Sequence, residues 1–363
     1  MKNCEVLESL FERDKIDLNR GSLFDIDMQG KGPGFDFNRI EGMLLGLAIG
    51  DALGATSEGL TPSARQAKYG EISEYLPHPL AGGEALGLPT DDTQLAFWTL
   101  ESLVEMNEFK PEHVAELFAS RRIYGIGRTV RGFISAYKRG RPWYECGPRS
   151  AGNGALMRIA PMLIPYLKSG NRGLWVDTAL SAMMTHNDAA STSACLAFIG
   201  MLWELLDLDS APEAEWWPQR YVELAHDLEG QTNYSPRGGR FTDFHGPLWQ
   251  FVHEKLAWAL QNNLSTVDAC NSWYSGAFLL ETVPSVLYIL MRHADDPQAA
   301  IQRAVNDTQD NDTVAAIVGA AVGALHGRRK LPQHLVEGLV GRTGGSDDGR
   351  VFELIRSSRL LFA

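Results

Sequence analysis

The sequence is poor in cysteine and shows no pattern in which cysteines would build a structural site. Four occur among 363 residues, at Cys4, Cys146, Cys195 and Cys270, and no two of them form a C-x-x-C pair. A zinc site or a disulfide framework would need clustered or regularly spaced cysteines. We therefore expect reduced thiols and a cytoplasmic location.

Long apolar runs are also missing. The two best apolar stretches, residues 154–167 and 277–291, are too short for a membrane-spanning helix and contain Arg158 and Glu281 respectively. The N-terminus carries charges where a signal peptide would have an apolar segment. We expect no membrane among the partners of this protein.

Basic residues are in the minority. The chain has 33 Lys and Arg against 45 Asp and Glu, which gives a formal net charge of -12. Such a surface repels nucleic-acid phosphates and anionic lipid and attracts metal ions or a cationic partner, so we expect no nucleic-acid partner. With 44% hydrophobic residues, the chain is able to bury a sizeable core.

Strand-like alternation is rare, whereas apolar residues recur at helical spacing from Ile40 onward. Residues 207–247, rich in Pro, Gly and Trp, are expected to form an insertion with a long loop. The pattern predicts an all-α fold with a single multi-helical domain over residues 38–363. Helices are expected over residues 90–106, 111–120, 174–184, 189–206, 248–261, 284–293, 297–305 and 313–326.

Residues 1–37 differ from the rest of the chain and are interpreted as an N-terminal arm. Residues 4–13 fit a short amphipathic helix, and residues 23–28 alternate apolar and acidic side chains as an extended segment does. We expect the arm to dock on this chain or on a partner, because a merely flexible tail would not need its large apolar residues. These are Leu7, Leu10, Phe11, Leu23 and Phe24.

Glycines recur every four residues in two predicted helices. Each glycine inside a helix costs about 0.8–1 kcal/mol relative to alanine. The pattern therefore predicts a close helix–helix contact, possibly of the two glycine faces with each other, although glycines can also bring the backbone near a ligand. The glycines are Gly42, Gly46, Gly50 and Gly54 in one helix and Gly319, Gly323 and Gly327 in or after the other.

Two acidic clusters each precede a predicted helix, Thr90-Asp91-Asp92-Thr93 and Asp310-Asn311-Asp312-Thr313. Such residues often cap helix N-termini. Capping uses only one or two side chains per helix end, so the surplus carboxylates predict a second role. If the two ends converge, the carboxylates repel one another unless a cation lies between them, and oxygen ligands favour magnesium, manganese or calcium over zinc.

Three further segments carry polar groups with two possible roles each. Glu58 is either a site acid or base or a solvated helix end, and Asp51 is either a capping or a buried structural carboxylate. Gly152-Asn153-Gly154 precedes a helical run and forms either an anion-binding nest or an ordinary tight turn. His186 lies between two predicted helices, where a structural role is the more common one.

Together and in this order, five segments resemble the ADP-ribosylglycohydrolase family of the dinitrogenase-reductase-activating type. The resemblance covers residues 40–326 and implies an all-helical fold with a binuclear site for magnesium, or manganese. It also implies hydrolysis of the N-glycosidic bond in ADP-ribosylated protein, with ADP-ribosyl-arginine as the expected substrate. The segments are GMLLGLAIGDALGATSEG, LPTDDTQLAFWTLESL, SAGNGALMRIAPM, MTHNDAAS and AVNDTQDNDTVAAIVGAAVGALHG.

The resemblance also implies a role for individual residues. Glu58 and Asp92 would be catalytic. The metal ligands would be Thr90, Asp91, Asp92, Asp310, Asp312 and Thr313. The substrate would be bound by Ser150, Gly152, Asn153, Gly154 and His186. The chain departs from the family at Thr308-Gln309, where a Gly-Gly pair is usual, and at Asn311, where threonine is common.

The arm resembles that of bacterial immunity proteins of this family, which implies that residues 1–37 could bind and block an ADP-ribosyltransferase toxin. Two other functions fit the sequence: a non-catalytic protein that binds ADP-ribose or inhibits a transferase, and a structural metal-binding protein. The intact acidic clusters favour the hydrolase.

Overall fold

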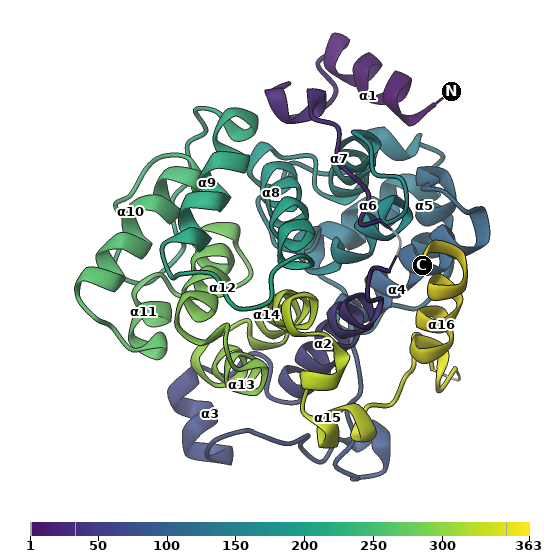
Figure 1. Ribbon diagram of the computed structural model, residues 1–363. Helices are drawn as coiled ribbons and strands as arrows, with labels where there is room; N and C mark the ends of the chain where they lie inside the picture. Colours follow the sequence, from purple (N-terminus) through teal and green to yellow (C-terminus); the bar gives the residue numbers. More distant parts are fainter. Residues whose placement is uncertain (1, 33, 346) are drawn as a thin grey trace.

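The computed structural model describes residues 2–32, 34–345 and 347–363. Within these residues the chain forms α-helices and short 3-10 helices and no β-strand, although a few isolated bridges occur. The helices surround a central pair, α2 and α14 (Figure 1). The predicted all-α fold is thereby confirmed.

The α-helices are α1 (Asn3–Glu12), α2 (Asn38–Ala55), α3 (Pro62–Tyr69), α4 (Asp91–Met106), α5 (Pro111–Ser120), α6 (Arg128–Lys138), α7 (Gly173–Thr185), α8 (Ala189–Leu205), α9 (Trp216–Glu229), α10 (Leu248–Gln261), α11 (Thr266–Ser272), α12 (Leu279–His293), α13 (Pro297–Asp307), α14 (Asn311–His326), α15 (Gln333–Gly338) and α16 (Arg350–Phe362). The 3-10 helices are η1 (Ser22–Asp25), η2 (Pro79–Ala81), η3 (Trp143–Glu145), η4 (Leu156–Arg158), η5 (Ala160–Tyr166) and η6 (Arg328–Lys330).

The central contact is made by backbone rather than by side chains. Helices α2 and α14 run antiparallel, and a Cβ atom added to Gly46 would lie 2.1 Å from the carbonyl oxygen of Gly319. A Cβ on Gly54 would lie 2.4 Å from Cα of Asp312. The predicted contact between the two glycine faces is confirmed, and it places the C-terminal end of α2 beside the N-terminal end of α14.

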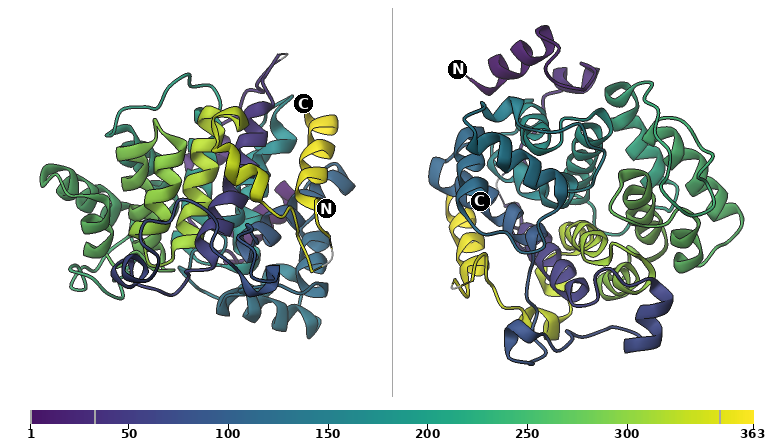
Figure 2. Two further views of the ribbon diagram at one scale, coloured as in Figure 1. Left: turned by 90° about the horizontal axis from the view of Figure 1, so that it is seen from below. Right: turned by 180° about the vertical axis from the view of Figure 1, so that it is seen from behind.

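Around this pair, α4, α8, α12 and α13 form the inner layer, and α9 to α11 lie outside α8 and α12 (Figures 1 and 2). Residues 230–247 contain no helix and form the expected long loop, whereas helix α9 lies within residues 207–247 and was not expected there. Its Trp217 and Tyr221 are buried at helical spacing, which organises the segment despite its Pro and Gly content. None of the helices in the described ranges is long and apolar enough to cross a membrane.

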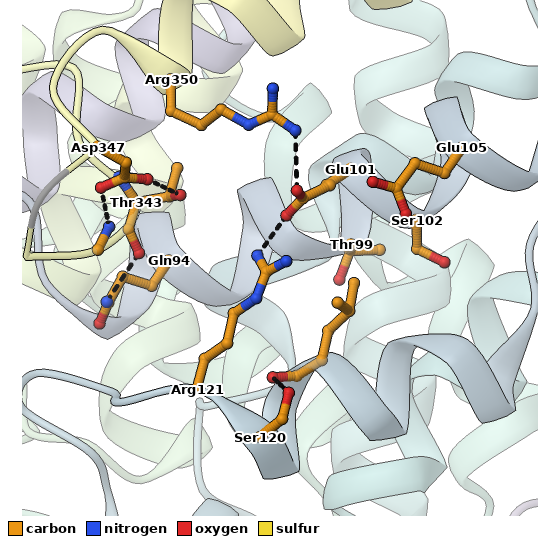
Figure 3. A network of polar contacts seen from close by, with 12 residues as sticks. Gln94, Thr99, Glu101, Ser102, Glu105, Ser120, Arg121, Thr343, Asp347 and Arg350 are labelled. Atoms are coloured by element: carbon orange, nitrogen blue, oxygen red, sulfur yellow. Dashed lines mark hydrogen bonds and ion pairs between the residues drawn. The ribbon is translucent and has the colours of Figure 1, made fainter.

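The C-terminal helix α16 is fastened to α4 by a buried carboxylate (Figure 3). Glu101 on α4 accepts hydrogen bonds from Arg121, just after α5, and from Arg350 at the start of α16, the latter at 2.8 Å. Burial opposes ionisation, but the two guanidinium groups outweigh it and lower the pKa of Glu101. The bond between Glu101 and Arg350 therefore attaches α16 to α4, the helix that begins at the first predicted acidic cluster.

Residues 2–32 lie against the chain itself, with α1 packed on α7 (Figure 1). Leu7 and Leu10 of α1 are buried. Residues 22–25 form the 3-10 helix η1, so the expected extended segment is wrong here. An extended strand would point consecutive side chains to opposite faces, whereas the tight turn lets both Leu23 and Phe24 enter the core.

We expect Gly46→Ala to destabilise the fold by about 3 kcal/mol or more, because the added Cβ can only be accommodated if the two central helices move apart. Urea unfolding would measure the loss. Gly127→Ala is the control, because the described residues leave open space around a Cβ there. Similar losses in both variants would contradict the packing argument.

Candidate active site and metal centre

The acidic segment at the start of α4 is fixed by a carboxylate from α2. Asp51, fully buried, accepts hydrogen bonds from the backbone N–H groups of Thr90 and Thr93, at 2.8 and 3.0 Å, and from both threonine hydroxyls, at 2.7 and 2.6 Å. Asp51 thus caps α4 from another helix, as a buried structural carboxylate. In the described chain, the side chains of Thr90 and Asp310 cap neither α4 nor α14. The capping interpretation therefore does not account for these two residues.

Carboxylates from three helix ends gather in two adjoining groups. Oxygen atoms of Asp51, Asp92 and Asp312 lie within 4.8 Å of one another, and so do oxygen atoms of Glu58, Asp310 and Asp312. Asp312 belongs to both groups. The two acidic clusters, separated by more than two hundred residues, therefore converge as the sequence predicted.

The electrostatics of this cluster favour a bound cation. Burial, followed by repulsion from Asp51 and the other aspartates, raises the pKa of Asp92 well above its ordinary range. Burial and Asp51 also raise the pKa of Asp91 to about 7. Asp92 Oδ1 is buried and finds no hydrogen-bond donor among the described residues. An orphaned carboxylate oxygen between like charges fits a hard, oxygen-seeking metal ion.

Arg65 lies near the carboxylates, but its hydrogen bonds go to other groups and do not pair it with them. Arg65 is fully buried, but its guanidinium donates to Ser57 Oγ and to three backbone carbonyl groups. Asp312 raises the pKa of Arg65 only against a larger effect of burial, which lowers that pKa to about 10. The hydrogen bonds of Arg65 therefore hold the loop behind the carboxylates together.

The two departures from the family pattern lie in this supporting layer. Asn311 Nδ2 donates to the carbonyl of Gly54 at 3.1 Å and to Ser57 Oγ at 2.9 Å, which ties α14 to the end of α2. Thr308 is buried, and its hydroxyl donates to the carbonyl of Ala304 at 2.6 Å. Both side chains thus position the acidic loop from behind.

A cleft of about 740 Å³ opens above the carboxylates. Most of the predicted site residues line it: Glu58, Asp91, Ser150, Gly152, Asn153, Gly154, His186, Asp310, Asp312 and Thr313. Of the described residues, Thr90 and Asp92 are not on its surface, and Asp92 is only 1% exposed. Asp91 faces the cleft without belonging to either three-carboxylate group in the described chain.

Residues 151–153 are held at the cleft by backbone hydrogen bonds to residues 277–279, which form an isolated antiparallel bridge. Asn153 Nδ2 donates to Asp310 Oδ2 at 2.5 Å and to Thr282 Oγ1 at 3.0 Å, so this amide orients an acidic side chain. The chain continues into η4 and η5 rather than into an α-helix. The predicted anion nest therefore has no full helix dipole behind it.

His186 is buried at the cleft wall as a neutral imidazole. Burial, with a smaller effect of the Arg158 cation, lowers the pKa of His186 to about 3. Arg158 donates to Thr185 Oγ1, and the same hydroxyl shares a hydrogen bond with Nδ1 of His186 at 2.9 Å. The other ring nitrogen, Nε2, is the atom that a Cβ on Gly154 would approach to 3.2 Å.

The cleft also contains residues that the sequence did not single out. Arg128, Arg149 and Arg237 line it, together with Tyr234 and Phe278. These arginines are far apart in the sequence and follow no motif, so only the fold reveals a cationic edge on an acidic protein.

Arg237 is held rigidly at this edge. Its guanidinium donates to both oxygens of the buried Glu281, at 3.1 and 2.7 Å, and lies 5.4 Å from the ring centroid of Phe278. Tyr234 packs edge-on against Phe278, with 6.2 Å between ring centroids. The cleft thus combines an acidic floor with a basic and aromatic wall.

The chain matches the model of one protein family over most of its length. The model of the ADP-ribosylglycohydrolase family matches residues 34–359. The chain therefore belongs to the ADP-ribosylglycohydrolase family.

Its relatives have several substrates. The ADP-ribosylarginine hydrolase Tri1 of Serratia proteamaculans is 28% identical over 84% of this chain and 75% of its own length. The ADP-ribosyl-(dinitrogen reductase) glycohydrolase of Rhodospirillum rubrum is 26% identical over 81% of this chain and 88% of its own. A solved structure described as an ADP-ribosylglycohydrolase-related protein complex has a TM-score of 0.65 and 26% identity and covers 90% of this chain and 97% of its own.

We expect His186 to make the fold acid-sensitive. An unfolded histidine titrates near pH 6.5, about three units above His186 in the fold. Below that pH the unfolded chain binds a proton that the native state does not, so His186 costs stability as the pH falls from about 6.5 toward 3. At pH 5 this cost is about 2 kcal/mol.

The measurement is the free energy of unfolding at pH 7 and pH 5 for the wild type and His186→Gln. Between pH 7 and pH 5, the free energy of unfolding should fall by about 2 kcal/mol more in the wild type than in His186→Gln. An identical change in both proteins would show that His186 titrates normally.

Proposed function

We propose that the protein is a magnesium-dependent hydrolase that cleaves the N-glycosidic bond between ADP-ribose and an arginine side chain of a modified protein. One observation supports this above all: two groups of carboxylates share the buried Asp312 at the floor of a cleft whose edge carries arginines. The floor suits divalent cations, and the edge suits a diphosphate. ADP-ribose needs both.

The metal ligands we propose come from the two acidic segments. Asp91, Asp92, Asp310 and Asp312 supply carboxylate oxygens, and Thr90 and Thr313 supply hydroxyl oxygens. An all-oxygen set suits magnesium, with manganese as an alternative, and Asp51 and Asn153 orient it through Thr90 and Asp310. When bound, two such ions would orient the ribose hydroxyls and acidify a water molecule.

Diphosphate binding is assigned to the segment around Gly152 and to the arginine edge. Ser150, Gly152 and Gly154 bring backbone close to the cleft, next to Nε2 of His186. Arg128 and Arg237 add positive charge where the negative floor would otherwise repel an anion. The rings of Tyr234 and Phe278 offer a surface for adenine.

In the proposed reaction, water adds its hydroxyl to the anomeric carbon as the carbon–nitrogen bond breaks, and the guanidine nitrogen takes up a proton. The transition state has oxocarbenium character. Of the two catalytic candidates, Glu58 borders the cleft, whereas Asp92 is buried. Partial burial and the charges of Asp310 and Asp51 raise the pKa of Glu58. We therefore assign the water's proton to Glu58 and metal binding to Asp92.

Arginine is the linkage we propose because a relative that the match covers over 75% of its length is named an ADP-ribosylarginine hydrolase. Toxin blocking by residues 1–37 stays a prediction. Leu7, Leu10, Leu23 and Phe24 of the arm are buried against the chain itself, so a partner would meet mainly its polar outer face.

We expect Asp92→Asn to lower the turnover of ADP-ribosyl-arginine protein by at least about 100-fold, because it removes a charge from the proposed metal site. EDTA should abolish turnover in the wild type, and added magnesium should restore it. Release of ADP-ribose is the readout. The control Asp295→Asn changes an exposed carboxylate between α12 and α13 and should leave turnover unchanged.

Magnesium should also raise the melting temperature of the wild type but not that of Asp92→Asn, because it relieves repulsion among buried carboxylates. Full turnover in Asp92→Asn would contradict the role of this residue. Stabilisation by magnesium without any hydrolysis would favour a structural metal protein instead.

We expect the wild type to release ADP-ribose from arginine-linked substrate at least about 10-fold faster than from serine-linked substrate, a difference of about 1.4 kcal/mol in transition-state free energy. The comparison uses the same target protein and the same magnesium concentration. Equal or faster release from serine would refute the proposed linkage and leave the glycohydrolase chemistry in place.

A further inference from the structure

One stretch of the N-terminal arm lies at the cleft rather than on the far side of the domain. Ile16 and Leu18 are buried and hold the backbone between them in place. Asp17 lies between these two anchors. The match to the family begins only at residue 34, so this stretch lies outside the matched region.

Backbone groups of this stretch form hydrogen bonds with the side chain of Asn187. The N–H of Asp17 donates to Asn187 Oδ1 at 2.9 Å, and Asn187 Nδ2 donates to the carbonyl of Lys15 at 2.8 Å. Asn187 directly follows His186 in the cleft wall. Because the amide is bound at both its oxygen and its nitrogen, the arm fixes the turn that carries His186.

The side chain of Asp17 reaches the other wall segment. Its Oδ2 lies 3.0 Å from Nε of Arg149, the residue before Ser150. The N–H of Asn187 donates to the carbonyl of Pro148 at 3.1 Å, which joins the two wall segments to each other. Lys15 and Asp17 thus contact both segments that carry proposed substrate-binding residues.

Arg149 lines the cleft, and its side chain is 79% exposed. A free arginine at such a position would occupy many rotamers and lose them on binding a ligand. Asp17 forms an ion pair at the Nε edge of the guanidinium and leaves the two Nη groups for an anion in the cleft. A diphosphate is the anion that the proposed function supplies.

We propose that Arg149 is a further binding residue for the diphosphate of ADP-ribose, and that Asp17 of the arm is its positioning residue. The arm then packs on the domain and also positions a residue of the substrate site. This inference rests on the proposed function for the identity of the ligand.

A double-mutant cycle in the full-length protein tests it, with the Kd of ADP-ribose measured by calorimetry at saturating magnesium. Arg149→Ala should raise the Kd by at least about 10-fold, the size of a charge-assisted hydrogen bond. Asp17→Ala should raise it by about 3-fold, and the double variant should bind no more weakly than Arg149→Ala. Asp17→Asn, which keeps an oxygen acceptor, should recover part of the affinity.

With arginine-linked substrate, Asp17→Ala should raise KM while kcat stays within about two-fold, because its effect is on binding. Asn3→Ala is the matched control. It removes arm contacts to Asp177 and Phe109, neither of which is among the residues lining the cleft in the described chain. It should lower the melting temperature and leave the Kd unchanged.

Amide hydrogen exchange without ligand separates this inference from the proposed function. Residues 148–154, which contain Arg149, should exchange faster in Asp17→Ala than in Asn3→Ala, whereas residues 186–188 keep their hydrogen bonds to the arm backbone and should exchange alike. Equal exchange of residues 148–154 in the two variants, or additive losses of affinity in the cycle, would overturn the role of Asp17. A wild type that binds no ADP-ribose would refute the proposed function and the role of Arg149, while the exchange rates would still decide whether the arm holds the cleft wall.

Discussion

The site depends on the contact between α2 and α14. Because glycines face each other there, the two backbones approach closely enough to place Gly54 against Asp312. This approach brings the ends of two helices, more than two hundred residues apart in sequence, into one acidic cluster. A pair of helices separated by ordinary side chains would lie about 8–10 Å apart, and their terminal carboxylates could not share Asp312 in the same way.

The cluster shows how a fold maintains an unfavourable arrangement. Buried carboxylates repel one another, and burial raises the pKa values of Asp92 and Asp312. The surrounding bonds compensate in part, since Asp51 accepts four hydrogen bonds from Thr90 and Thr93 and serves as the cap of α4. The remaining repulsion is the driving force for binding a cation. The carboxylates therefore differ in their surroundings. Asp51 caps α4, whereas Asp92 Oδ1 finds no hydrogen-bond donor among the described residues.

Much of this could be predicted from local patterns, and the failures have physical causes. Helical periodicity predicted the fold class. The two acidic clusters hold more carboxylates than helix capping uses, and this surplus indicated a metal site. The arginine edge could not be predicted, because Arg128, Arg149 and Arg237 become neighbours only through tertiary packing. Helix α9 was missed because Pro and Gly in its flanks outweighed the buried spacing of Trp217 and Tyr221. The individual roles of the site residues stay predictions, since geometry alone does not measure chemistry.

The glycine contact also restricts how the sequence can change. In a packed core, a larger residue on one helix can be offset by a smaller one opposite. Between α2 and α14 this exchange is impossible, because the partner of Gly46 is Gly319 and neither has a side chain to give up. A smaller residue opposite therefore cannot compensate for a larger one across this seam. In this chain, such compensation is open to the outer helices, which pack through side chains, and closed to the two central ones.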